Sequence, residues 1–209
     1  MNPRFWIAAH HNNSFEEAAQ NPEAPAPVLR FLLDEGEQSE EEAPRLLTLL
    51  SLNPGSPSDV VGRLLQSPNP NIAASAAAHS AAPSGALAEA AGSRYIQVRS
   101  AVAANSRTPA QTLAELAGDA EREVRKSVAE NPNIPAATAT RLADDEYWLV
   151  KYNLATVTQD PKVLRKLAKA DKHLIRTAVA RNAKTPANVR EQLAQDEVPK
   201  VAQSAQGQG

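Results

Sequence analysis

The sequence predicts an all-α fold, an α-solenoid of about seven helix–corner–helix repeats with a 26-residue period and no sheet. Three observations predict it. Prolines recur at a fixed spacing, columns of apolar residues recur in the same frame, and no segment alternates apolar and polar residues as a strand requires. Several columns in one register are hard to obtain by chance, so the repeat is the strongest signal in the chain.

The prolines define the corner of each repeat. Six of them recur every 26 residues, except for a final interval of 25: Pro57, Pro83, Pro109, Pro135, Pro161 and Pro186. Four residues before each proline lies a column that is mostly asparagine: Asn53, His79, Asn105, Asn131, Val157 and Asn182. Asn21 and Pro25 form the same pair, 32 residues earlier, because extra residues lie in the acidic stretch Glu35–Glu42. Asparagine tolerates left-handed backbone conformation, so we expect it to end the preceding helix in that conformation.

The apolar columns define one helix of each repeat. The first column holds β-branched residues: Ile72, Val98, Val124, Val150 and Ile175. Four residues further on comes a second apolar column, each member followed directly by alanine: Ala76, Val102, Val128, Leu154 and Val179. Apolar residues at i, i+4 and i+5 form one stripe of a helix, and the small alanine lets a neighbouring helix approach closely. We therefore expect these helices to stack.

Helix-start signals predict a second helix after each corner. Four of the prolines directly follow a residue with a capping side chain: Ser56, Thr108, Asp160 and Thr185. Such a side chain at the N-cap accepts an unpaired helix N–H, and a proline at the first helical position has no N–H to leave unpaired. Apolar pairs such as Leu113/Leu116 and Leu164/Leu167 then continue one face. Neither short helix buries its stripe alone, so stacking of repeats must supply the core.

The repeat motifs resemble those of a known family. The segments Val98–Asn105, Val124–Pro135 and Ile175–Asn182 are similar to repeats of the leucine-rich repeat variant family, over roughly residues 46–205 and more weakly 14–33. The resemblance implies alternating α and short α or 3₁₀ helices in a right-handed superhelix without strands. Some members hold an iron–sulfur cluster through N-terminal cysteines, and this chain has no cysteine, so no cofactor is implied here. No particular activity is implied either, since function lies in sites rather than in folds.

The domain organisation follows from the frame. We predict a single repeat domain over residues 1–205 and a flexible tail over 206–209, the domain comprising an N-terminal cap (1–20), an acidic insertion (34–45), regular repeats (46–195) and a C-terminal half-repeat cap (196–205). The acidic insertion has two interpretations, a solvated loop or a docking site for a basic partner. No apolar run approaches the ~18 residues of a membrane span, and Met1–Phe15 lacks a signal-peptide core. We therefore expect a cytoplasmic protein without a membrane partner.

The charge is distributed unevenly. The formal net charge is −2, but residues 1–60 carry ten acidic and three basic side chains, whereas residues 147–190 carry ten Lys or Arg and two Asp. The sequence lacks a nucleophile elbow, a phosphate-binding glycine loop and any metal-ligand spacing, and its lack of cysteine removes disulfide and thiolate chemistry. We therefore expect no enzyme, no metal and no cofactor, and look for function in a binding surface.

A basic column is the first candidate for that surface. Its members directly follow the β-branched column: Arg99, Arg125, Lys151 and Arg176. In a stacked solenoid they form a ladder, which suits phosphates or an acidic protein segment. The alternative is that each base pairs with a carboxylate near the adjacent corner, such as Asp119 or Asp144, as part of the architecture.

An aromatic cluster beside this column is the second candidate. Trp148 and Tyr152 concentrate aromatic rings in a chain that has few, and Lys166 adds a base on the following predicted helix. The rings can anchor a peptide or stack on nucleobases, or they pack at the repeat corner; we expect Tyr152 to be the more exposed. We predict a protein–protein interaction scaffold with a protein partner bound at these residues. The alternative is nucleic-acid binding through the basic C-terminal repeats.

Overall fold

The computed structural model describes residues 1–39 and 43–207, and within them every regular element is a helix and none is a strand. The helices are α1 (Pro3–His11), α2 (Phe15–Gln20), α3 (Ala26–Gln38), α4 (Ala43–Leu52), α5 (Ser58–Leu64), α6 (Pro70–Ala78), α7 (Ser84–Ala90), α8 (Ile96–Ala104), α9 (Ala110–Leu116), α10 (Arg122–Glu130), α11 (Ala136–Leu142), α12 (Trp148–Val157), α13 (Pro161–Leu167), α14 (His173–Arg181), α15 (Ala187–Leu193) and α16 (Pro199–Gln206). The predicted all-α solenoid of paired helices is confirmed. The handedness of its superhelix stays a prediction.

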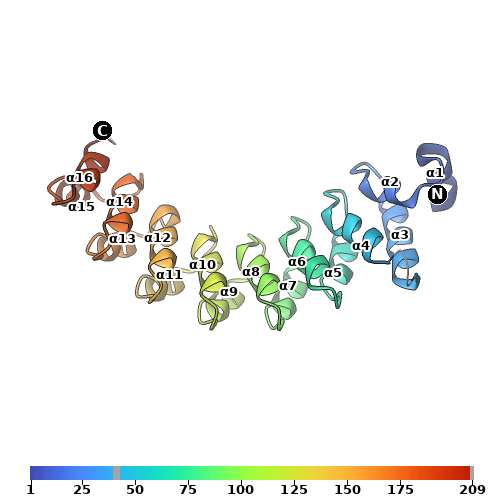
Figure 1. Cartoon of the computed structure of the whole chain (residues 1–209), viewed down its shortest axis with the longest axis horizontal. Coiled ribbons are helices and arrows are strands. Elements are labelled where there is room, and N and C mark those ends of the chain that lie inside the picture. The colour runs from blue at the N-terminus through green and yellow to red at the C-terminus, as the bar shows by residue number, and fades with distance from the viewer. Residues whose placement is uncertain (40–42, 208–209) are drawn as a thin grey trace. The chain divides into compact units, whose positions relative to one another are not determined.

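The chain divides into two compact units, Met1–Pro109 and Ala110–Gly209. In the first unit α2, α4, α6 and α8 follow one another side by side, and α5 and α7 lie against this row (Figure 1). The helix α1 closes the row at its beginning by packing on α2 and α3, with Ile7 buried beneath it. The single repeat domain predicted for residues 1–205 stays a prediction.

The second unit repeats the same arrangement. The row α10, α12, α14 and α16 packs side by side, while the seven-residue helices α11, α13 and α15 form a second layer (Figure 1). The predicted apolar columns form its core: Val124, Val128, Val150, Leu154, Ile175 and Val179 are all buried. Ala129, Ala155 and Ala180 have no exposed surface. Each of these alanines is therefore fully covered by its surroundings, as expected for the packed face of a row helix.

The asparagine corners differ from the prediction in their backbone. Asn105, Asn131 and Asn182 have φ near −72° and extended ψ, and among the described residues only Asn12 and Asn13 of the non-glycine residues have positive φ. The prediction of a left-handed helix end is therefore wrong. The reason lies in the side chain, which joins two repeats: Asn182 Nδ2 donates to the carbonyls of Ala155 (2.8 Å) and Thr158 (2.9 Å).

The same asparagine also shapes its own corner. Asn182 Oδ1 accepts the Lys184 N–H at 2.8 Å, so one buried amide satisfies three backbone groups. Asn53 and Asn105 repeat the pattern, donating to carbonyls one repeat back and accepting the N–H two residues on. Asparagine therefore serves these corners through both sides of its amide and not through backbone freedom.

Two corners replace this asparagine. His79 Nε2 donates to the Asn53 carbonyl at 2.9 Å and Nδ1 accepts the Ala81 N–H at 3.0 Å, an arrangement that a neutral ring with its proton on Nε2 can make. In the other case α12 extends through Val157, so that Thr158 takes the corner and its Oγ1 accepts the Asp160 N–H at 3.2 Å. The placement of Val157 in the asparagine column is therefore wrong by one residue.

The predicted N-caps are correct at only one of the four positions. Asp160 caps α13 by accepting the Lys162 N–H at 2.8 Å, with Pro161 at the first helical position. By contrast, Ser56 Oγ donates to the Leu50 carbonyl at 2.7 Å and Thr185 Oγ1 to the Val179 carbonyl at 2.6 Å, and Thr108 bonds in the same way. These buried hydroxyls satisfy the end of the preceding helix, because the extended proline after them delays the next helix by one residue.

Candidate partner-binding site

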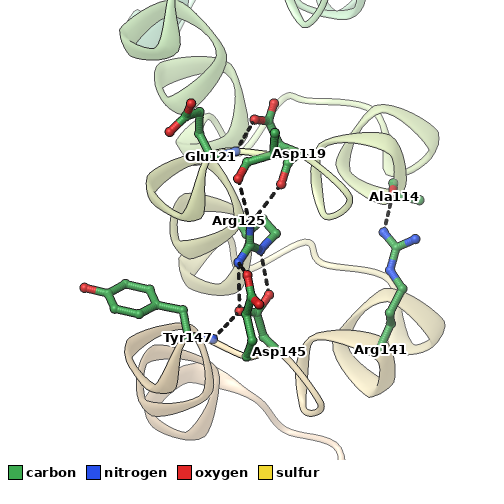
Figure 2. Close-up of polar contacts among 9 residues, drawn as sticks. Ala114, Asp119, Glu121, Arg125, Arg141, Asp145 and Tyr147 are labelled. Atoms are coloured by element: carbon green, nitrogen blue, oxygen red, sulfur yellow. Dashed lines mark hydrogen bonds and ion pairs between the residues drawn. The ribbon is translucent and has the colours of Figure 1, made fainter.

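Arg125 of the basic column joins two consecutive corners (Figure 2). Its Nε and Nη2 donate to the two carboxylate oxygens of Asp145 at 2.7 and 3.2 Å, and its Nη1 donates to the carbonyls of Asp119 and Ala120 at 3.0 and 3.1 Å. Asp145 is itself held by the Tyr147 N–H, which its Oδ1 accepts at 2.8 Å. Both side chains are largely buried, and the hydrogen bond that Arg125 donates to Asp145 raises the pKa of Arg125 above its ordinary value.

Arg176, two repeats further on, makes the same arrangement. It donates to both carboxylate oxygens of Asp196 at 2.7 and 3.0 Å and to the carbonyls of Ala170 and Asp171 at 2.8 and 2.9 Å. The guanidinium lowers the pKa of Asp196, chiefly through this hydrogen bond. The planar fork of arginine suits such bidentate pairing. Arg125 and Arg176 therefore follow the alternative interpretation of the basic column, in which each base pairs with a carboxylate near the adjacent corner. The partner of Arg125 is Asp145 and not Asp144, which was named from the sequence.

The remaining predicted bases lie elsewhere. In the first unit, Arg99 Nη1 donates to the Ser93 carbonyl at 2.8 Å. Lys151 of the second unit occupies the same column as Arg125 and Arg176, yet among the described residues its ammonium has no hydrogen bond and no ion pair. The carboxylate 20 residues further on is Asp171, which is exposed and, in the described part of the chain, has no hydrogen bond to its side chain. The ladder is therefore interrupted at Lys151.

A hollow of about 520 Å³ lies at this interruption, between the corner before α12 and the corner before α14. We call it the Trp148 hollow; its charged and aromatic lining comprises Trp148, Lys151, Lys166, Lys169, Lys172, Asp144, Glu146 and Asp171. Lys166 pairs with Asp144, and Glu146 pairs with Arg125 at 3.3 Å. Lys172 Nζ lies 5.5 Å from the centre of the Trp148 ring. Three of the seven predicted binding residues therefore meet here.

A second depression, of about 200 Å³, is lined by residues of α12, α14 and α16 and by Asn182, and we call it the Tyr152 groove. Its lining includes Tyr152 and Leu174 together with the cations Arg181 and Lys200, and holds no carboxylate among the described residues. Leu174 is one of the few large apolar side chains that stay exposed. Trp148 meets the edge of Tyr152 with 6.2 Å between ring centres, so the two rings connect the groove with the hollow. Both rings are half-buried, and the expectation that Tyr152 is the more exposed of the two stays a prediction.

Several lining residues were not among the predicted ones: Lys169, Lys172, Leu174, Arg181 and Lys200. The frame contained a signal for three of them. Leu174 and Lys200 share a column with Leu149 and Glu123, and Arg181 shares one with Thr156 and Glu130, so these columns vary freely and face outward. Sequence reasoning concentrated on the columns that recur, whereas Leu174, Arg181 and Lys200 stand in columns that vary.

The acidic stretch of the first unit is partly neutralised within that unit. Arg63 binds Asp34 at 2.7 Å and also pairs with Glu37, while Arg4 binds Glu35 at 2.7 Å. Residues Glu40, Glu41 and Glu42 of the predicted insertion lie outside the described residues. Within the described residues, no three His, Cys, Asp or Glu side chains gather as a metal site would require, and no helix is long and apolar enough to cross a membrane.

Comparison with known proteins agrees with the repeat geometry. Residues 96–121 and 122–146 match the leucine rich repeat variant family model. The fold is similar to the solved structure of a leucine-rich repeat variant with a novel repetitive structural motif, at 19% identity and a TM-score of 0.64, covering 97% of this chain and 85% of that one. A designed armadillo repeat protein is more distant, at 15% identity and a TM-score of 0.40, covering 93% of this chain and 98% of that one.

These findings define the protein as an α-solenoid repeat protein. Two of its repeats, at residues 96–121 and 122–146, match the leucine rich repeat variant model, so the resemblance predicted from the motifs is confirmed. Comparison with curated proteins gave no match.

Proposed function

We propose that the protein is a non-enzymatic scaffold that holds a segment of a protein partner against its second unit, in the Tyr152 groove and the adjoining Trp148 hollow. The observation that carries this proposal is the lining of the groove. An exposed Leu174 and a half-buried Tyr152 share this lining with the cations Arg181 and Lys200, and no carboxylate is among the described lining residues. An apolar anchor flanked by acidic side chains fits such a lining.

The energetics favour a peptide-like segment. Tyrosine and tryptophan contribute large contact areas with few rotatable bonds, which is why they dominate binding at protein interfaces. Trp148 and Tyr152 already contact each other, so less rotamer freedom is lost when a partner covers them. The predicted bases Arg125 and Arg176 support this surface from within, because their guanidinium groups hold consecutive corners together.

Nucleic-acid binding through the basic repeats is the less favoured alternative. A phosphate backbone requires a continuous basic track. The row of helices that forms the groove begins with α10, where Glu121 and Glu130 are exposed, and Lys126 is paired with Glu123 at 2.7 Å. These acidic side chains interrupt such a track. The cytoplasmic location expected from the sequence stays a prediction.

Site-specific photo-cross-linking in cells that express the protein natively tests the proposal. With p-benzoylphenylalanine in place of Tyr152, we expect one stoichiometric protein adduct, which disappears when Leu174→Asp is introduced. The matched control places the same cross-linker at Asn188, which is exposed on the second layer of helices. The proposal fails if no protein adduct forms at Tyr152, or if Asn188 forms the same adduct in equal yield. A nucleic-acid adduct at Tyr152 would establish the alternative instead.

A further inference from the structure

The interruption of the ladder at Lys151 changes the charge of one corner. Arg125 and Arg176 each place a fork between their own corner carbonyls and an aspartate 20 residues further on. Lys151 has neither the fork nor these bonds, and Asp171 stays exposed instead of being drawn inward like Asp145 and Asp196. Both Lys151 and Asp171 line the Trp148 hollow.

The charges that line this hollow do not cancel. Two of its three carboxylates are already paired, Asp144 with Lys166 and Glu146 with Arg125. Among the described residues the ammonium groups of Lys151, Lys169 and Lys172 have no carboxylate partner. Against these three positive charges the lining has only Asp171. Unpaired like charges around one hollow repel one another, and a bound anion would relieve that repulsion.

We propose that the Trp148 hollow binds a multi-oxygen anion, a carboxylate cluster or a phosphoryl group, carried by the same partner segment that the Tyr152 groove holds. The inference rests on the function proposed above and names the chemistry of the partner. Lysine ammonium groups on flexible stems bind such anions as point charges. The Trp148–Tyr152 contact sets the anion next to the groove, so a peptide with an apolar anchor and an acidic or phosphorylated neighbour spans both.

A guanidinium from the partner is the main alternative occupant. It would restore the missing fork by binding Asp171. Three unpaired ammonium groups in the same lining oppose it, which is why an anion is favoured.

Tryptophan fluorescence provides a direct test without the natural partner. The chain has two tryptophans, so Trp6→Phe leaves Trp148 as the only one. We expect hexaglutamate, inorganic pyrophosphate or both to change Trp148 emission with saturation and with an affinity that falls as salt rises. Saturation by pyrophosphate indicates a phosphoryl group, and saturation by hexaglutamate alone indicates a carboxylate cluster. The proposal is overturned if neither saturates, if hexa-arginine binds more tightly, or if an oligothymidylate binds more tightly than both anions.

The Lys151→Arg variant tests whether anion binding requires the open hollow or only its positive charge. We expect arginine to bind Asp171 as Arg125 binds Asp145, which fills the hollow while keeping the net charge. Anion affinity should then fall about tenfold or more and the midpoint of thermal unfolding should rise. Asp171→Asn in that background should reverse the gain in stability. Unchanged anion affinity in Lys151→Arg contradicts the proposal.

Charge-matched variants complete the experiment. Lys169→Gln and Lys172→Gln should each weaken anion binding several-fold. Lys184→Gln removes the same charge from an exposed residue outside the hollow and should change the affinity by less than about twofold. Equal loss in all three would reduce the effect to net charge and overturn the site. Failure here leaves the cross-link at Tyr152 intact, whereas failure of the scaffold function removes that cross-link and leaves the fluorescence titration unaffected.

Discussion

The guanidinium of Arg125 and the carboxylate of Asp145, 20 residues apart in the chain, form a two-point ion pair at 2.7 and 3.2 Å that joins one repeat corner to the next. Arg176 and Asp196 form the same pair at 2.7 and 3.0 Å. Between them Lys151 and Asp171 hold the equivalent positions without pairing in the described structure. One repeated contact therefore serves the architecture, and its interruption at Lys151 coincides with the candidate binding site.

Removing an arginine of the ladder should destabilise the second unit. Arg125→Ala leaves Asp145 buried without its partner and frees two corner carbonyls, so we expect a loss of about 3 kcal/mol in the free energy of unfolding. Urea denaturation followed by circular dichroism measures it. Arg165→Ala, at an exposed position of α13, is the control and should change stability by less than about 0.5 kcal/mol. A loss at Arg125 no larger than at Arg165 would show that the pair contributes nothing.

The Arg176–Asp196 pair should give acid-dependent stability. The pKa of Asp196 is lowered in the folded protein, so its contribution is present above the unfolded value, about 3.9, and is lost as pH falls through the folded value. We therefore expect Asp196→Asn to be less stable than wild type at neutral pH, with a difference that shrinks as the solution is made acidic. Unfolding free energies measured from pH 7 to pH 2 test this. Arg176→Gln should show the same shrinking difference, and a difference independent of pH in both variants would refute the linkage.

Variants of Asn182 should show whether the corner asparagine acts through its side chain or through its backbone conformation. Asn182→Ala should cost about 2 kcal/mol or more, because the carbonyls of Ala155 and Thr158 and the N–H of Lys184 lose their partner. If left-handed conformation mattered, Asn182→Gly would be tolerated; we expect it to destabilise at least as much as alanine, since the residue is extended. Asn188→Ala, on an exposed face, is the control for urea denaturation. A stabilising Asn182→Gly would restore the backbone explanation.

His79 should be replaceable by asparagine, the residue that most other corners have at this position. His79→Asn supplies the same donor toward Asn53 and the same acceptor toward Ala81, so we expect stability within about 1 kcal/mol of wild type. His79→Ala removes both bonds at a buried corner and should cost about 2 kcal/mol. Thermal unfolding of the two variants side by side makes the comparison. Equal loss in both would mean that the imidazole contributes through its shape and not through its hydrogen bonds.

Much of the fold could be predicted from the chain. The columns around Val124 and Val128 identified the buried face of each row helix, because burial recurs with the helical period. The candidate site was predicted only in part. Trp148, Lys151 and Lys166 line one hollow, as predicted for a binding site. Arg125 and Arg176 instead form ion pairs inside the fold. The sequence could not distinguish these roles, because bases available to a partner and bases paired within the fold recur with the same spacing.

The details of the corners depended on three-dimensional contacts. Ser56 and Thr185 have the sequence signature of N-caps, yet each bonds to the helix before it, because the following proline is extended and the nearest unsatisfied carbonyl lies behind. Likewise, the spacing in the sequence placed Val157 at the corner, but α12 extends through Val157 and the corner residue is Thr158. The local sequence shows which side chains can form hydrogen bonds, and the packing of the repeats determines which backbone group each one bonds to.

Periodicity along the chain was sufficient for the class of fold, for the core and for the leucine rich repeat variant type of repeat, because each of these depends on features that recur every 26 residues. The tertiary structure was required for the bonding at the corners and for the interruption of the ladder at Lys151. Whether a base at the ladder position is paired depends on the distance to a carboxylate in the next repeat, which sequence spacing does not contain. Only the folded chain shows that Arg125 reaches Asp145 while Lys151 leaves Asp171 unbound and the Trp148 hollow open.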